Sequence, residues 1–179
     1  MKEFLEPSLI RWNLRYGVRA EPDAGSWKAN SGMKSRIMLE MLEEKKEDIV
    51  FLDADSTIER FPELFARIPE EYDIACHWLD WDKQYGKKNE PLELLSGTLL
   101  WRYNDTALEL LKYWIDEVCL RPNLWEQKCL HEALKKFPVR VFDLPYEYCA
   151  IKRKNGTTAC EEPVILHHQK SREYRRRKK

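Results

Sequence analysis

The sequence lacks the features that mark several large classes of protein. It has no apolar run long enough to span a membrane and no signal peptide, so it predicts neither a membrane-spanning nor a secreted chain. Lysine plus arginine and aspartate plus glutamate each number 31, so the chain has no overall charge bias, and no specific nucleic-acid partner is expected. No internal repeat divides it. We predict one domain over residues 1–170, followed by a basic tail at residues 171–179.

The cysteines exclude the usual zinc-binding and disulfide scaffolds. All five are scattered through the chain without a CxxC pair, so the sequence predicts neither a zinc ribbon nor a disulfide framework. Reduced thiols are the simplest interpretation, and they predict a cytoplasmic location. A bridge between Cys149 and Cys160, across the loop that separates them, stays open as an alternative.

The most informative stretch is IVFLDADSTI, at residues 49–58. Ile49 to Leu52 form a short apolar run between polar segments, which is typical of a buried strand. Asp53 and Asp55 follow where that strand ends, and α/β sheets bind ligands beyond the carboxyl ends of their strands. Two carboxylates at such a place suit Mg²⁺ or Mn²⁺, which in turn hold phosphate oxygens. In the structural alternative, Asp55 caps a turn and Asp53 is only solvated.

The spacing of apolar residues divides the rest of the chain into helices and strands. Helices are predicted at residues 2–15, 33–42, 61–68, 106–118 and 124–137. Strands are predicted at residues 16–20, 49–52, 72–78, 93–103, 139–144 and 164–166, with an exposed loop at 79–91 and an extended segment at 145–151. This order predicts an α/β fold with a mainly parallel sheet. Ser96 and Gly97 interrupt one strand, which often marks a bulge or a close approach of the backbone to a ligand.

A series of motifs runs along the chain: SW followed by a lysine, then FLDADS, LLSGTLL, WEQKCL and VILHHQKSR. Together they resemble the motifs of nucleotide-diphospho-sugar glycosyltransferases with the GT-A fold, and the resemblance covers residues 26–175. It implies a Rossmann-type sheet flanked by helices, and a DxD motif that holds Mn²⁺ or Mg²⁺ against the diphosphate of the donor. A UDP-sugar is the favoured donor, and a glycan, a lipid or a protein is the acceptor.

One departure from this family concerns the start of the chain. The family begins with a strand that carries the nucleotide-base site, whereas this sequence begins at or just before the helix that follows it. The first strand is therefore expected to be missing. The sheet edge that it would leave open favours a homodimer.

The resemblance also implies roles for the acidic and histidine residues of the motifs. Asp55 would ligate the metal directly, and Asp53 would contact the metal or the ribose of the donor. His167 would complete the coordination, with His168 as the alternative.

Further residues are assigned to the donor sugar and the reaction centre. Ser96 and Gly97 would lie against the donor sugar or the acceptor, and Glu126 and Gln127 would face the reaction centre. An inverting transferase needs a carboxylate base, for which Glu126 is the first candidate. A structural role competes, because acidic residues at a helix start also favour the helix dipole. Weaker candidates for the base are Asp80 and Asp82.

Basic and aromatic residues complete the expected donor site. Trp27 and Lys34 stand near the start of the helix at 33–42, where Lys34 would reach the diphosphate or remain a solvated lysine. Arg172 would help to neutralise the diphosphate. The basic tail that contains it is expected to touch an anionic membrane surface, to hold RNA weakly, or to stay solvated.

Two other functions are compatible with the same motif. DADST also fits the DxDxT motif of haloacid dehalogenase-type phosphatases, with Asp53 as nucleophile and Asp55 as acid and base. The position of the motif far from the N-terminus argues against this hypothesis. A degenerate, non-catalytic nucleotide-binding domain is the other alternative.

Overall fold

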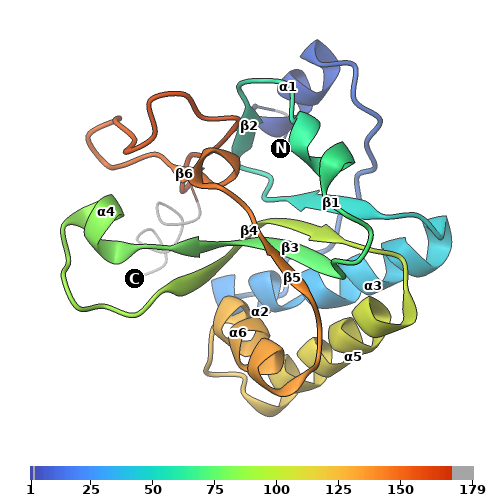
Figure 1. Cartoon of the computed structure of the whole chain (residues 1–179). Helices are drawn as coiled ribbons and strands as arrows, with labels where there is room; N and C mark the ends of the chain where they lie inside the picture. Colours follow the sequence, from blue (N-terminus) through green and yellow to red (C-terminus); the bar gives the residue numbers. More distant parts are fainter. Residues whose placement is uncertain (2, 171–179) are drawn as a thin grey trace.

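The computed structural model describes residues 1 and 3–170 and contains both helices and strands (Figure 1). The helices are α1 (Leu5–Arg11), α2 (Trp27–Gly32), α3 (Lys34–Lys45), α4 (Trp81–Tyr85), α5 (Asp105–Leu120) and α6 (Glu126–Lys136). The strands are β1 (Ile49–Leu52), β2 (Ser56–Ile58), β3 (Ile74–Leu79), β4 (Glu93–Trp101), β5 (Val141–Asp143), β6 (Ala150–Ile151) and β7 (Ile165–His167). Two 3₁₀ helices are η1 (Glu63–Arg67) and η2 (Tyr146–Tyr148). The predicted tail, with Arg172, lies outside the described residues.

The main sheet has the strand order β1-β4-β3-β5. Strand β4 runs antiparallel to both of its neighbours, and β3 and β5 are parallel. Strands β1, β3 and β5 therefore point the same way, but the central position of β4 makes most of the pairing antiparallel. This corrects the expectation of mainly parallel pairing. The reason lies in the strand order, because β4 is inserted between β1 and β3 and runs against both of them.

A second, smaller sheet joins the segment after β1 to two strands near the end of the described chain. Strand β7 lies between β2 and β6, antiparallel to β2 and parallel to β6. In this register Ser56 lies opposite His167. The pairing thus brings the end of the described chain to the segment that directly follows Asp53 and Asp55.

Helices α3, α5 and α6 cover one face of the main sheet (Figure 1). Their apolar side chains meet those of the strands in the largest cluster of buried residues. Trp101 of β4 stacks on Trp114 of α5, with ring centroids 6.1 Å apart and planes 7° apart. Because burial of apolar surface is the main favourable term in folding, this helical layer supplies most of the stability of the sheet.

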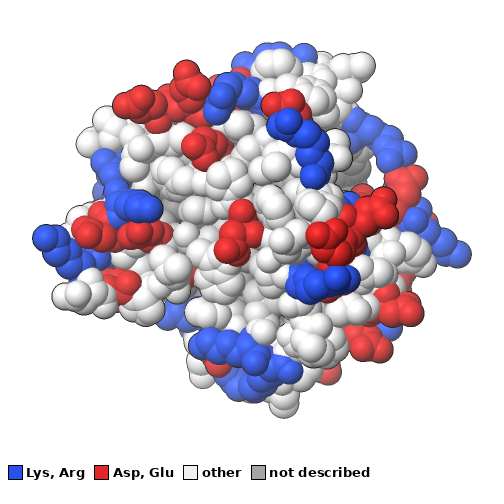
Figure 2. Space-filling view, in the orientation of Figure 1, with Lys and Arg blue, Asp and Glu red and all other residues white. Residues whose placement is uncertain are grey.

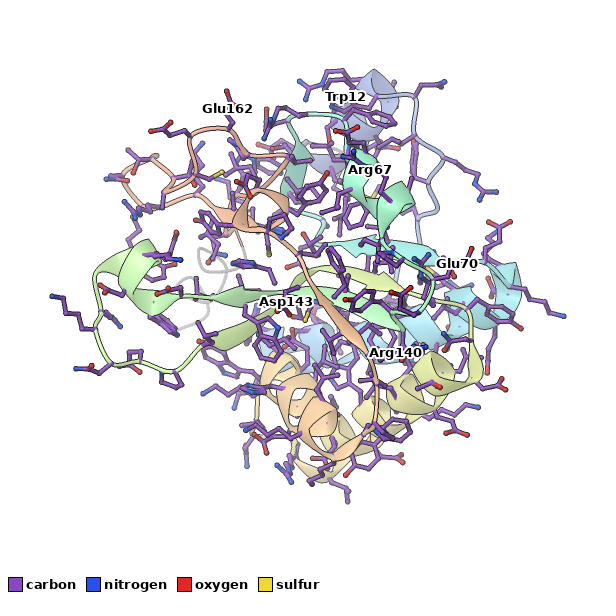
Figure 3. The ribbon with its side chains drawn as sticks, in the orientation of Figure 1. Trp12, Arg67, Glu70, Arg140, Asp143 and Glu162 are labelled. Atoms are coloured by element: carbon purple, nitrogen blue, oxygen red, sulfur yellow. The ribbon has the colours of Figure 1, made fainter. Side chains whose placement is uncertain are left out.

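The N-terminal helix packs on the smaller sheet. Leu5 and Leu9 of α1 form a cluster with Ile58 of β2, and Trp12, labelled in Figure 3, donates its indole N–H to the carbonyl of Ile58 at 2.9 Å. The helix is shorter than the predicted 2–15. It ends because Asn13 adopts a left-handed backbone, with φ of 50°, which asparagine tolerates better than most residues.

The predicted strand at residues 16–20 does not form. Most of this segment is exposed, and no described strand pairs with it. Among the described residues no strand precedes β1, whose second edge is unpaired.

Three loop and helix predictions also change. The segment at 79–91 contains the short helix α4, residues 61–68 form the 3₁₀ helix η1, and residues 145–151 contain η2 and β6. The five cysteines are free, so the alternative bridge between Cys149 and Cys160 does not form. Within the described part of the chain, no helix is long and apolar enough to cross a membrane.

The packing of the helical layer predicts that two leucines of α5 contribute very differently to the free energy of unfolding. Leu111 is fully buried, whereas Leu120 is 78% exposed. We expect Leu111→Ala to lower the free energy of unfolding by about 2–5 kcal/mol, because it leaves a cavity. The matched change Leu120→Ala is expected to stay within about 0.5 kcal/mol. Urea denaturation followed by circular dichroism measures both, and equal effects would show that α5 does not pack as described.

Candidate metal centre

Strand β1 delivers two aspartates to the carboxyl end of the main sheet. The backbone N–H of Asp53 donates to the carbonyl of Gly97 at 2.9 Å, which extends the β1–β4 pairing by one residue. Ser56 then donates its backbone N–H and its hydroxyl to the carbonyl of Asp53, at 3.0 and 2.7 Å. This tight turn reverses the chain into β2 and holds both carboxylates at the strand end.

Pairing of β2 with β7 adds a histidine to the two carboxylates. One ligand atom from each of Asp53, Asp55 and His167 lies within 4.8 Å of the others. Carboxylate oxygens suit Mn²⁺ and Mg²⁺, and an added imidazole nitrogen is a common transition-metal ligand. The residues therefore fit a divalent cation, as the sequence predicted. His168 is not part of this cluster: its ring contacts Thr57 at 3.0 Å and packs against Phe4.

The orientation of His167 is fixed from behind by β4. Its Nε2 lies 2.9 Å from the hydroxyl of Thr98, and the ring is buried. When Nε2–H donates to that hydroxyl, Nδ1 keeps its lone pair for a metal. Burial lowers the pKa of His167, against the opposing effect of Asp53 and Asp55, so the neutral, ligating form is favoured.

Gly97 provides the space for this arrangement. A Cβ atom there would lie 2.8 Å from Cε1 and 3.0 Å from Nδ1 of His167, and 3.1 Å from a carboxylate oxygen of Asp53. The pairing of β4 with β3 is also irregular at this place, with a register shift between Ala75 and His77. The register shift confirms the predicted bulge. The close approach of Gly97 is to His167 and Asp53, and its approach to a ligand stays a prediction.

Lys34 links the metal centre to the helical layer. It is buried, and its Nζ lies 3.0 Å from a carboxylate oxygen of Asp53 and 3.5 Å from one of Glu126. It also donates to the carbonyl and the hydroxyl of Ser96, at 3.0 and 3.1 Å. Burial acts to lower the pKa of Lys34, but the two carboxylates outweigh it and raise that pKa. Lys34 is thus a buried, charged group, and the alternative of a solvated helix lysine is wrong.

Glu126 and Gln127 approach the site from the start of α6. Glu126 is 7% exposed and accepts a hydrogen bond from the Ser96 hydroxyl at 3.0 Å. Gln127 accepts from the backbone N–H of Ser96 at 3.2 Å and donates to Glu93 at 2.8 Å. The structure therefore brings Lys34, Ser96, Glu126 and Gln127 together beside Asp53. In this arrangement the carboxylate of Glu126 pairs with the ammonium group of Lys34 and accepts the hydrogen bond of the Ser96 hydroxyl.

The other predicted residues lie around this core. Trp27 packs edge to face on Trp125, which is the residue before α6, and the two ring centroids are 5.7 Å apart. Asp80 caps α4 by accepting from two backbone N–H groups, and Asp82 is exposed on the same helix. The capping role accounts for Asp80 without any part in catalysis.

Sequence reasoning missed two residues that hold the candidate metal ligands in place. Thr98 orients His167, and the backbone N–H of Lys170 donates to a carboxylate oxygen of Asp55 at 2.6 Å. Thr98 lies two residues after Ser96, and alternation along a strand would have placed it on the same face. The contact of Lys170 depends on the left-handed backbone of Gln169, which no sequence pattern announces.

The chain belongs to the nucleotide-diphospho-sugar transferase family, whose sequence model matches residues 15–178. No curated protein matches this chain. Among solved structures, it is similar to a glycosyltransferase involved in the glycosylation of the major capsid of PBCV-1, with 17% identity and a TM-score of 0.68 over 98% of this chain and 90% of that one.

Two further solved structures share parts of the fold. The bifunctional glycosyltransferase WbbM is 12% identical, with a TM-score of 0.53 over 82% of this chain and 32% of that one. Mouse xyloside xylosyltransferase 1 is 15% identical, with a TM-score of 0.50 over 92% of this chain and 71% of that one. The GT-A-like α/β fold predicted from the motifs is therefore confirmed, and the family match does not support the phosphatase hypothesis.

The space at Gly97 leads to a prediction about metal binding. We expect Gly97→Ala to weaken binding of Mn²⁺ by about 10–100-fold, because the added methyl group displaces His167 and Asp53. Isothermal titration calorimetry with Mn²⁺ measures this. The control is Gly17→Ala, whose Cβ meets only the flexible end of Met41 at 3.3 Å. Undiminished Mn²⁺ affinity in Gly97→Ala would contradict the proposed ligand set.

The buried ion pairs of Lys34 lead to a prediction about stability. Lys34→Met is expected to lower the free energy of unfolding by about 3–5 kcal/mol, because Glu126 is left buried and unpaired. The double variant Lys34→Met/Glu126→Gln should recover part of that loss. Urea denaturation of the wild type, both single variants and the double variant gives the coupling energy. Strict additivity would mean that the two residues do not interact.

Proposed function

We propose that this transferase moves a sugar from a nucleotide-diphosphate donor, with a UDP-sugar favoured, to an acceptor, and that it depends on Mn²⁺ or Mg²⁺. The observation that carries the proposal is the cluster of Asp53, Asp55 and His167 at the carboxyl end of β1. Membership of the nucleotide-diphospho-sugar transferase family supports the donor class.

The chemical problem in such a transfer is the charge that develops on the leaving diphosphate. A bound divalent cation supplies Lewis acidity at the diphosphate oxygens. The backbone N–H groups that hold Asp55 keep its carboxylate in place before the donor arrives. Both donors belong to the segment directly after β7. The N–H of His168 donates to the backbone carbonyl of Asp55, and the N–H of Lys170 donates to its carboxylate. Such preorganised groups stabilise charge without reorganising during the reaction.

We assign the donor sugar to the surface formed by Lys34, Ser96, Glu126 and Gln127. These side chains offer both hydrogen-bond donors and acceptors, which is what the hydroxyl groups of a sugar require. Because Lys34 and Ser96 already hold Glu126, its proposed role is to position these groups and the sugar, and its role as general base remains a prediction. Trp27 and Arg172 remain proposed donor contacts.

The proposal also covers the oligomeric state of the protein and its location in the cell. The unpaired edge of β1 supports a homodimer formed by edge-to-edge pairing. A cytoplasmic location and a weak contact of the basic tail with anionic membranes remain predictions from the sequence.

The first test is a thermal-shift screen of UDP, GDP, CDP and their sugars, with and without Mn²⁺. A ligand at a hundred times its Kd adds about 2.7 kcal/mol of stability. For a chain of this size that raises Tm by roughly 5–10 °C. We expect such a shift for one nucleotide class, only with Mn²⁺, and its loss in Asp55→Asn.

The control variant is Asp82→Asn, which removes an exposed carboxylate from α4. It should keep the full shift. Slow hydrolysis of the matching nucleotide sugar without an acceptor then separates a transferase from a non-catalytic binding domain. A shift that does not need Mn²⁺ would rule out the metal-dependent mechanism.

A further inference from the structure

A groove of about 920 Å³ opens beside the candidate metal centre. Its walls are α4, the loop that follows β6 and the segment that follows β7, and Figure 1 shows α4 and that loop on the same side of the molecule, at the left. The volume is that of a typical ligand pocket. It is far larger than a diphosphate group alone requires.

The groove carries charge of one sign. Among the described residues, its lining includes five cationic residues and no acidic one; the cations are Lys87, Lys152, Arg153, Lys154 and Lys170. On the face drawn in Figure 2 as a whole, acidic and basic side chains are interspersed. Of the five, Lys87, Lys152, Arg153 and Lys154 form no ion pair with any acidic residue in the described part of the chain. Their charges are therefore available to an anionic ligand.

Aromatic rings form another part of the lining. Trp81 and Tyr85 of α4 lie with ring centroids 5.2 Å apart, and Nζ of Lys87 stands 4.8 Å from the ring of Trp81. The C–H faces of sugar rings are apolar, and they pack well on such amphipathic aromatic surfaces.

Two lining residues also carry buried polar atoms without a partner. The hydroxyl of Tyr85 and Nε of Arg153 make no hydrogen bond within the described residues. Buried polar atoms normally have a partner, so these two atoms are exceptions in the wall of the groove.

Backbone hydrogen bonds join this groove to the metal ligands. The N–H of His168 donates to the carbonyl of Asp55 at 3.0 Å, and that of Lys170 to its carboxylate at 2.6 Å. The N–H of Lys152 donates to the carbonyl of His167 at 2.9 Å. All three donors belong to residues that line the groove, so its wall is joined directly to the proposed metal ligands.

We propose that this groove binds the acceptor and that the acceptor is an anionic oligosaccharide. The inference rests on the proposed transferase function and adds its acceptor class. The cations bind the acidic groups, the aromatic rings of α4 bind the sugar rings, and the link to Asp55 and His167 brings the acceptor to the donor.

The test is isothermal titration calorimetry of the full chain at low salt with tetragalacturonate, a tetrasaccharide with four carboxylates. Maltotetraose serves as the neutral ligand of equal length. We expect binding of tetragalacturonate that weakens as salt is raised, and much weaker binding of maltotetraose. A heparin-derived tetrasaccharide in a parallel titration shows whether carboxylates or sulfates are preferred, and tight binding of either one supports the proposal.

Matched variants locate the binding site. Lys152→Gln/Lys154→Gln should weaken tetragalacturonate about fivefold to tenfold, since each exposed charge contributes a modest amount. Lys45→Gln/Lys112→Gln removes the same charge from exposed positions on α3 and α5, and it should change the affinity less than about twofold. Thermal unfolding of each variant confirms that it is folded. Equal losses in both double variants, or equal binding of maltotetraose, would overturn the proposal.

Two competition experiments distinguish an acceptor groove from a nucleic-acid site and from a part of the donor site. A single-stranded oligonucleotide with four phosphates that binds more tightly than both acidic tetrasaccharides would make the groove a nucleic-acid site instead. Displacement of tetragalacturonate by UDP with Mn²⁺ would make it part of the donor site, because donor and acceptor must bind together. Failure of UDP, GDP and CDP to bind with Mn²⁺ counts against the transferase function, whereas failure of both acidic tetrasaccharides to bind counts against the acceptor class.

Discussion

The buried ammonium group of Lys34 is the interaction on which the site depends. A charge with so little access to water needs compensating charges nearby, and Asp53 and Glu126 provide them. These carboxylates come from the end of β1 and the start of α6, while Lys34 begins α3. One buried cation therefore fixes how two helices meet the carboxyl end of the sheet.

The same charge balance explains why the site suits a divalent cation. Asp53, Asp55 and Glu126 bring three negative charges and Lys34 one positive charge, so the cluster has two net negative charges when His167 is neutral. A divalent cation neutralises them. The cations that line the groove after β6 and β7 lie outside this balance, so their charges stay available to the proposed acceptor.

The features that the sequence predicted best, a strand before Asp53 and a bulge at Ser96–Gly97, follow from local patterns. The apolar run before Asp53 and the Ser96–Gly97 pair inside a strand each have a physical meaning that does not depend on distant residues. The metal-ligand choice between His167 and His168 does depend on them, because it is decided by the register of β7 against β2. Lys34 could not be assigned from sequence either, since its burial arises only when α3 packs on β1 and α6.

The errors in the predicted fold also arise where the local apolar pattern does not decide the structure. The apolar spacing of residues 2–15 continues past Arg11, but the backbone of Asn13 ends the helix. The strands predicted around Ile49, Ile74 and Val141 do run in one direction. What the pattern did not reveal is that β4 enters between β1 and β3, because nothing in a strand sequence encodes its neighbours.

The segment that follows β7 connects the candidate metal centre to the groove. Gln169 has a φ of 58°, and this left-handed residue turns the chain so that the N–H groups on both sides of it reach Asp55. The side chains of the same three residues, 168–170, line the groove. The same short segment therefore supplies both the N–H donors to Asp55 and part of the groove wall. Because coupling free energies are reciprocal, any effect of a groove ligand on cation binding must equal the effect of the cation on that ligand.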